Sequence, residues 1–313
     1  MRQRDQLFQR ICTSQTQDVL ATIVNVEGSA YVREGSMLLI KENGERCGII
    51  SGGCLEEDVV MQAEKVRRQQ KAIICTYNMR EDEDPIWGEE VGCGGVISIL
   101  IEPVTEQLKD SLLNVQHWLG QRQTVVHAKI LCPDGKSVEN FFSPRVDQLE
   151  NRIELGKDVY KMIIRPTPHL IIFGAGQDVQ PLVSFAADTG FYVTVYDWRE
   201  GFIKRDQFLK ADYLFGQHLP SLLKETMFQS YDFSIIMTHN FQKDQEILQH
   251  LLQQDLPYIG VLGTKKRTQR LINNNQIPKN LHFPIGLPIG AKGPEEIAIS
   301  ILGELIQEWR KNG

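Results

Sequence analysis

Two glycines and an acid form the clearest chemical pattern in the chain. Gly174 and Gly176 follow an apolar, strand-like run, and Asp197 ends a second such run about twenty residues later. In a dinucleotide-binding βαβ unit, the first glycine permits a tight turn, the second lets a phosphate approach the backbone, and the acid accepts from ribose hydroxyls. Because an acid disfavours a 2′-phosphate, the pattern predicts NAD or another unphosphorylated nucleoside rather than NADP. A similar scaffold that binds no nucleotide stays open, and Val179 stands at the third glycine position.

Two further candidates follow later strand-like runs. His239 follows the apolar run 233–237 after one residue, Thr238, and the carboxyl ends of such strands face the ligand crevice of a parallel sheet. We therefore take His239 as a candidate catalytic or ligand-binding residue, with a purely structural histidine as the alternative. Gly263 precedes three cations, at positions 265–267, which together could hold an anion at a helix N-terminus. A solvated basic helix is the other interpretation.

Two of the six cysteines lie beside glycines. Cys54 follows Gly52 and Gly53, and Cys93 lies between Gly92 and Gly94. Glycines leave backbone N–H groups free to point at one ligand, and a thiolate near such donors is a soft metal ligand or a sulfur nucleophile. Cys54 and Cys93 are thus candidate reactive residues, although a buried, inert cysteine in a turn fits the local pattern too. No Cys-x-x-Cys pair indicates a zinc site.

Composition excludes several classes of protein. The 313 residues carry a formal net charge of −6, which argues against a nucleic-acid-binding protein with a basic face. No apolar run approaches the roughly 20 residues that span a bilayer, and the N-terminal residues lack the apolar core of a signal peptide. We therefore expect a cytoplasmic protein, with reduced thiols and no membrane partner.

The order of the elements predicts two domains. Before residue 166, short strands and hairpins mix with a few helices, which indicates an N-terminal α+β domain at 1–166. The two prolines of 165–168 break the pattern and predict a linker. After Leu170, strands and helices alternate, which predicts a Rossmann-like, doubly wound parallel sheet at 167–313. The fold class expected for the whole chain is therefore α/β.

Motifs in both halves together resemble one family, that of the xanthine dehydrogenase accessory proteins (XdhC/CoxI). In the first half these are Gly28-Ser29 through Arg33 and Gly35, Gly48 to Glu56, and Gly92-Cys-Gly-Gly95. In the second half they are Ile172-Phe-Gly-Ala-Gly176, Met237-Thr-His239, Tyr258 to Gly263, Pro284-Ile-Gly-Leu-Pro-Ile-Gly-Ala291 and Pro294 to Ala298. The family usually has a histidine where Gln177 stands, and a proline in the segment that here reads Ala30-Tyr-Val-Arg33.

The resemblance implies a chaperone for molybdenum cofactor rather than a hydroxylase. Such proteins bind the cofactor (molybdopterin), assist its sulfuration, and help deliver it to apo xanthine dehydrogenase or a related molybdenum hydroxylase. A cysteine desulfurase is the second partner that the resemblance implies, and a homodimer is the expected assembly. Cys93 becomes a candidate molybdenum contact. The full set of expected cofactor-binding residues is Gly52, Gly53, Cys54, Gly92, Cys93, Gly94, Gly174, Gly176, Asp197, His239 and Gly263.

Two other functions stay open at this point. Gly174, Gly176 and Asp197 would also suit an NAD-dependent oxidoreductase, in which His239 would act as acid or base. A nucleotide-sensing regulator without chemistry would need only the glycine turn. For the oxidoreductase, the sequence shows no evident companion for His239 and no clear signature of a substrate pocket.

Overall fold

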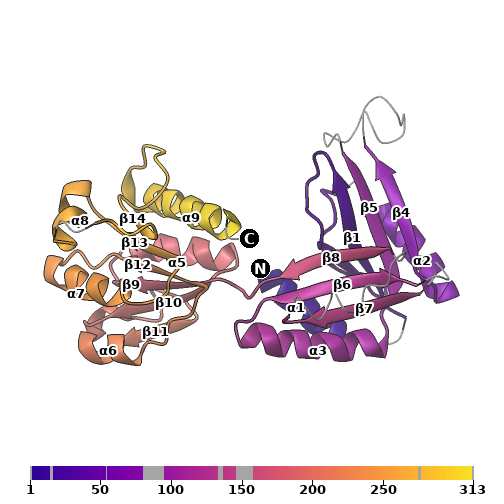
Figure 1. The fold of residues 1–313 in the computed structure, drawn as a ribbon, viewed down its shortest axis with the longest axis horizontal. Coiled ribbons are helices and arrows are strands. Elements are labelled where there is room, and N and C mark those ends of the chain that lie inside the picture. Colours follow the sequence, from indigo (N-terminus) through magenta and orange to yellow (C-terminus); the bar gives the residue numbers. More distant parts are fainter. Residues whose placement is uncertain are drawn as a thin grey trace. The chain divides into compact units, whose positions relative to one another are not determined.

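The computed structural model describes residues 2–14, 17–53, 55–79, 95–132, 137–145, 158–273 and 276–311. The chain divides into two compact units, Gln3–Pro166 and Thr167–Gly313, with the first two residues grouped with the second unit. Four of the expected site residues, Cys54, Gly92, Cys93 and Gly94, lie outside the described residues. Figure 1 shows the helices and strands of each unit.

The N-terminal unit combines antiparallel strands with three described helices. Its elements are α1 (Arg2–Cys12), β1 (Val19–Glu27), β2 (Met37–Ile40), β3 (Arg46–Gly48), α2 (Glu56–Gln69), β4 (Ile73–Asn78), β5 (Val96–Pro103), α3 (Glu106–Gly120), β6 (Val125–Leu131), β7 (Val138–Ser143) and β8 (Val159–Ile164). Five of the strands form one antiparallel sheet in the order β3-β2-β1-β5-β4, and three form a second in the order β7-β6-β8. This mixture of short strands, hairpins and a few helices is what the sequence pattern predicts before residue 166.

Alternation along β1 sends side chains to two different cores. Val19, Ala21 and Ile23 face α2 in one hydrophobic cluster. Leu20, between them, packs with α1 and α3 in another. Because side chains of a strand alternate between faces, both faces of the five-stranded sheet are covered, which explains why β1 reads as a continuous apolar run.

A charged cluster is buried between β5 and the three-stranded sheet. Lys129 on β6 is 0% exposed and pairs with Glu102 on β5. Asn140 on β7 bridges them, with its Nδ2 donating to Glu102 Oε2 at 2.8 Å and its Oδ1 accepting from Lys129 Nζ at 3.0 Å. The polar residues that complete this cluster make β7 read as a loop, which is why the apolar pattern did not predict it.

The C-terminal unit alternates strands and helices. Its elements are β9 (His169–Phe173), α5 (Val179–Asp188), β10 (Tyr192–Asp197), the 3₁₀ turn η1 (Glu200–Phe202), β11 (Tyr213–Gly216), α6 (Leu219–Glu225), β12 (Asp232–Ile236), α7 (Phe241–Leu251), β13 (Tyr258–Val261), α8 (Lys265–Leu271), β14 (Leu281–His282) and α9 (Gly293–Lys311). All six strands are parallel, in the order β11-β10-β9-β12-β13-β14. Counted within the unit, this is the order 3-2-1-4-5-6 of dinucleotide-binding folds.

Helices cover both faces of this sheet. Leu170 and Ile172 of β9 pack with α5 and α9 on one face. Ile171 and Phe173, the alternate residues, pack with α6, α7 and α8 on the other. The structure therefore confirms the predicted fold class: an α/β chain with a Rossmann-like, doubly wound sheet in its C-terminal part.

The Pro-Ile-Gly block before α9 is fixed to that helix by hydrogen bonds. Gly286 has φ +97°, and a Cβ there would lie 2.3 Å from Ser300 Oγ on α9. Its N–H donates to Glu304 Oε2 at 2.7 Å, and Ser300 Oγ donates to the Leu287 carbonyl at 2.7 Å. Glycine at position 286 is therefore required by the close approach of this loop to α9.

Candidate functional site

The glycine turn after β9 lies where the strand order of the sheet reverses. Gly174 has φ +123°, and a Cβ at this position would lie 2.3 Å from the carbonyl oxygen of Met237. Only glycine therefore lets the ends of β9 and β12 come so close. Gly176 follows in the loop that leads into α5, and its carbonyl accepts from the Val179 N–H at 3.1 Å in the first turn of that helix. Ligands of open parallel sheets bind at this switch point.

The carboxylate of Asp197, at the end of β10, accepts hydrogen bonds from neighbouring residues of the same unit. Its side chain is 0% exposed. Oδ1 accepts from the backbone N–H and the Nε of Arg199, each at 2.9 Å, and Oδ2 accepts from Arg199 Nη2 at 2.8 Å and from the Ala175 N–H at 2.9 Å. A ribose hydroxyl could reach this carboxylate only by displacing Arg199. The preference for an unphosphorylated nucleoside was inferred from a free carboxylate at position 197, and in this structure that carboxylate is already hydrogen-bonded.

Arg199 is held in place on three sides. Its guanidinium lies 3.7 Å from the ring centroid of Phe202 and 4.7 Å from that of Trp198, within the range of cation–π attraction. Hydrogen bonding to Asp197 raises the pKa of the arginine, opposed by partial burial. The side chain is 35% exposed, so part of the guanidinium faces solvent.

His239 lies across the crevice from the glycine turn and pairs with Asp178. Its Nε2 lies 2.8 Å from Asp178 Oδ2, and its imidazole is exposed. Because a carboxylate only accepts, Nε2 carries the proton, and the lone pair of the neutral ring is on Nδ1. His239 also has φ +59°, a left-handed conformation that is uncommon for a residue with a side chain. The sequence indicated His239 but not Asp178, whose role depends on a contact across 61 positions of the chain.

A buried acid supports the loop that carries His239. Asp244 of α7 accepts from Thr238 Oγ1, and its Oδ2 lies 2.5 Å from Arg267 Nη2 on α8. Arg267, expected to face an anion beside Gly263, is thus engaged within the domain. Lys265 and Lys266, in contrast, are exposed. The sequence did not single out Asp244, because an acid in the first turn of a helix is ordinary.

In the N-terminal unit, the loop after β1 touches two of the glycine-rich segments. A Cβ on Gly95 would lie 2.5 Å from the Ser29 carbonyl oxygen, and Gly52 lies beside the exposed ring of Tyr31. Ser51 Oγ accepts from the N–H groups of Gly53 and Leu55, at 3.1 and 3.2 Å. Gly52 and Gly53 are both exposed. Gly52 and Gly95 thus both lie next to the loop after β1, at the same end of the five-stranded sheet.

The described cysteines differ from a reactive thiol in their surroundings. Burial raises the pKa of the Cys12 and Cys75 thiols, so neither is prone to form a thiolate. Cys47 and Cys132 are also free and half-buried. Within the described ranges, no group of three or more His, Cys, Asp or Glu side chains could hold a metal ion. The two candidates Cys54 and Cys93 lie outside the described residues and stay predictions.

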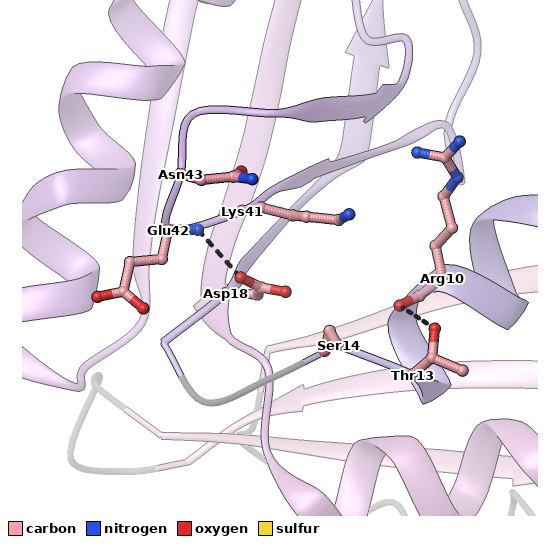
Figure 2. A pocket seen from close by; sticks show the side chains of 7 residues that line it. All are labelled: Arg10, Thr13, Ser14, Asp18, Lys41, Glu42 and Asn43. Carbon is pink, nitrogen blue, oxygen red and sulfur yellow. Dashed lines mark hydrogen bonds between the residues drawn. The ribbon is translucent and has the colours of Figure 1, made fainter.

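A polar cavity of about 440 Å³ lies at the opposite end of β1, between the end of α1 and the β2–β3 turn. Its lining residues are Arg10, Thr13, Ser14, Asp18, Lys41, Glu42 and Asn43 (Figure 2). Asp18 accepts from the Glu42 N–H at 3.0 Å, and both cations pair with Glu45. Because its charges are compensated within the protein, this cavity does not indicate a particular ligand.

No helix in the described part of the chain is long and apolar enough to cross a bilayer.

Two family models match the chain. Residues 170–305 match the model described as the XdhC Rossmann domain, and residues 12–78 match that of the XdhC and CoxI family. The first match contains the glycine turn of the C-terminal unit, and the second contains the loop after β1 in the N-terminal unit. Gly95, which packs against this loop, lies outside the second match.

Whole-chain similarities extend these matches. A protein of Bacillus subtilis, named as a probable xanthine dehydrogenase subunit, is 36% identical over 97% of each chain. The Escherichia coli "Molybdenum cofactor insertion chaperone PaoD" is 23% identical, over 92% of this chain and 82% of its own. A crystal structure from Bacillus halodurans, described as a xanthine dehydrogenase, superposes with a TM-score of 0.89 at 40% identity, over 98% of this chain and 96% of its own.

Proposed function

The chain belongs to the XdhC and CoxI family, and from this premise we propose that it is an accessory factor for a molybdenum hydroxylase. In this role it binds molybdenum cofactor as cargo, assists its sulfuration and passes it to an apoenzyme of the xanthine dehydrogenase type. A relative named as a molybdenum cofactor insertion chaperone supports the nature of the cargo. Another relative, whose name refers to xanthine dehydrogenase, supports the nature of the recipient.

The observation that carries this proposal is the meeting of the glycine-rich segments at one end of the N-terminal sheet. Gly52 and Gly95 both contact the loop after β1, and each lies two residues from a cysteine in sequence. Gly52 is exposed and lets a flat, polar cargo approach the backbone, whereas Gly95 is buried against the Ser29 carbonyl and fixes the loop after β1 in place. A thiol beside them suits a soft metal centre or the transfer of sulfur. We propose Cys54 and Cys93 as these thiols, with Cys93 as the molybdenum contact.

A cysteine desulfurase is the partner that this chemistry requires. The sulfur of a sulfurated cofactor must come from a donor, and a cysteine persulfide is the carrier that a desulfurase supplies. We further propose a homodimer, for which the exposed Ile299 on α9 offers part of an apolar surface. Light scattering of the full chain tests this assembly, and a monomer at micromolar concentration would contradict it.

The proposal is tested by purifying the full chain anaerobically from a host that makes molybdenum cofactor. We expect molybdenum and pterin to co-purify in comparable molar amounts. Cys93→Ala should lower loading or the activation of an added apo-hydroxylase, while Cys12→Ala, a half-buried cysteine outside the proposed site, should leave both unchanged. Absence of both molybdenum and pterin from the wild-type protein would contradict the proposal.

An NAD-dependent oxidoreductase is less well supported. The pair formed by His239 and Asp178 could exchange a proton with a ligand. However, the acid that would recognise the ribose of NAD is already bonded to Arg199 and Ala175.

A further inference from the structure

The carboxyl end of β10 presents an arginine where an NAD-binding domain presents an acid. The Nε and Nη2 edge of Arg199 is bonded to Asp197, at 2.9 and 2.8 Å. Its Nη1 has no hydrogen-bond partner among the described residues, and the side chain remains 35% exposed. The free N–H groups of Arg199 are therefore available to a ligand, whereas the carboxylate of Asp197 is not.

The position of Arg199 is fixed before any ligand arrives. Asp197 holds one edge of the guanidinium, and Phe202 lies against its face at 3.7 Å. Asp197 also accepts from the N–H of Ala175, inside the glycine turn, so the arginine is tied to the crevice and not to a distant surface. An arginine already held in its binding geometry loses little side-chain entropy when it takes up an anion.

We propose that Arg199 makes this crevice a site for a phosphate monoester, and that the site discriminates against a ligand with an unmodified ribose diol. A phosphate monoester carries close to two negative charges and three acceptor oxygens, which match the N–H groups of a guanidinium. In dinucleotide-binding folds, an arginine near this position accommodates the 2′-phosphate of NADP. The preference that Asp197 alone had suggested is thereby reversed.

The glycine turn carries an acid, which acts alike on NAD+ and NADP+ because both contain the same pyrophosphate. Asp178 lies at the start of α5, and its Oδ1 is 2.4 Å from the place where a Cβ on Gly176 would be. A carboxylate in this place opposes a pyrophosphate at the helix N-terminus. The polarity of the crevice is thus opposite to that of an NAD site, with a cation at the end of β10 and an acid at the glycine turn.

Two kinds of molecule share this chemistry, and matched ligand pairs distinguish them. The first pair is NADP+ and NAD+, which differ by one 2′-phosphate. The second is a synthetic pterin bearing a phosphate monoester and the same pterin without it. The second pair rests on the proposed function, because molybdopterin carries such a phosphate; the first pair does not.

Calorimetric titration of the full chain measures both pairs. We expect the phosphorylated member of at least one pair to bind about tenfold to a hundredfold more tightly than its partner, as for one charge-assisted contact. Arg199→Gln should abolish this difference, and Arg199→Lys should retain part of it. Arg270→Gln is the matched control, because Arg270 is an exposed arginine on α8 of the same unit, and its loss should leave the difference intact.

The remaining results each contradict the inference. These are equal binding within both pairs, tighter binding of NAD+ than of NADP+, no binding of any of the four ligands at millimolar concentration, or a preference that survives in Arg199→Gln. If Arg199→Gln does not fold, the inference is still tested by the affinities of the wild-type protein for the two ligand pairs and by those of Arg199→Lys. Absence of molybdenum co-purification together with a preference for NADP+ would refute the proposed function alone. Molybdenum co-purification without a phosphate preference in either pair would refute this inference alone.

Discussion

Substitution of Gly174 by alanine tests the packing argument for the Rossmann site most directly. The added Cβ would lie 2.3 Å from the Met237 carbonyl oxygen and 3.1 Å from the Thr238 nitrogen, which are backbone atoms of the neighbouring strand end. Neither atom can rotate away as the end of a side chain would. The backbone at φ +123° is also one that residues with side chains rarely adopt.

These two effects set the size of the loss. A residue held in a sparsely populated backbone region costs about 1–3 kcal/mol. Forcing an extra carbon into a filled space costs about 1–3 kcal/mol. Together they predict that Gly174→Ala lowers the free energy of unfolding of the C-terminal unit by roughly 2–6 kcal/mol. With an m-value of about 2 kcal/mol/M, the urea midpoint would fall by about 1–3 M.

Two other glycines of the same unit provide graded controls. At Gly201 an added Cβ meets nothing within 4 Å, so Gly201→Ala should change stability by less than about 0.5 kcal/mol. At Gly176 the Cβ meets the end of the Asp178 side chain, which can rotate away at the cost of one hydrogen bond to His239, about 1 kcal/mol.

The assay is hydrogen exchange of the full chain in increasing urea, followed by mass spectrometry on peptides from β9 and β12. It follows the C-terminal unit separately from the N-terminal one. The expected order of destabilisation is Gly174→Ala, then Gly176→Ala, then Gly201→Ala. If Gly174→Ala unfolds at the same urea concentration as Gly201→Ala, the close approach of β9 and β12 is refuted.

Three further predictions concern buried charges. Lys129→Met should destabilise the N-terminal unit by roughly 3–5 kcal/mol, because it leaves Glu102 buried without its cation. The double variant that also carries Glu102→Leu should recover most of this loss, measured by urea unfolding. A double variant as unstable as Lys129→Met would argue against the ion pair. Asp244→Ala should cost about 1–3 kcal/mol and loosen α8, measured as faster hydrogen exchange around Arg267, and unchanged exchange would contradict the contact. Burial opposes the ionisation of Glu304, but hydrogen bonds from three neighbours lower its pKa below the usual 4.5. The ionised Glu304 therefore stabilises the folded state fully above pH 4.5, and this stabilisation is lost as the pH falls through the lower, folded-state pKa. The thermal unfolding temperature of Glu304→Gln should accordingly depend less on pH in this range than that of the wild type. An equal pH dependence of the two proteins would refute the assignment.

Much of the fold could be predicted because it depends on local patterns. The alternation of apolar strands and amphipathic helices after Leu170 predicts a parallel sheet, and the strand order agrees with it. Four elements, β7, η1, α6 and β14, were not predicted. Their segments are short or polar, and they are fixed by tertiary contacts, such as those of Asn140 on β7.

The candidate site shows where sequence reasoning fails. The glycine turn and His239 were predicted because strand ends and glycines are visible in the sequence. The state of Asp197 was not, because a carboxylate free to bind ribose and one bonded to Arg199 have the same residue type and spacing. Asp178 was missed for a related reason, since its partner His239 is distant in the chain. Pairing between charged groups is decided by three-dimensional geometry.

The position of α9 has a consequence for how the protein is made on the ribosome. The hydrophobic cluster on one face of the C-terminal sheet contains Leu170 from the first strand and Trp309 from the last helix. α5 covers part of that face early, but the part that packs against α9 stays uncovered until residues 293–311 have been synthesised. The described clusters of the N-terminal unit need no residue beyond Ile164. The N-terminal unit can therefore fold during translation, whereas a nascent or truncated chain lacking α9 would expose an apolar sheet face prone to aggregation.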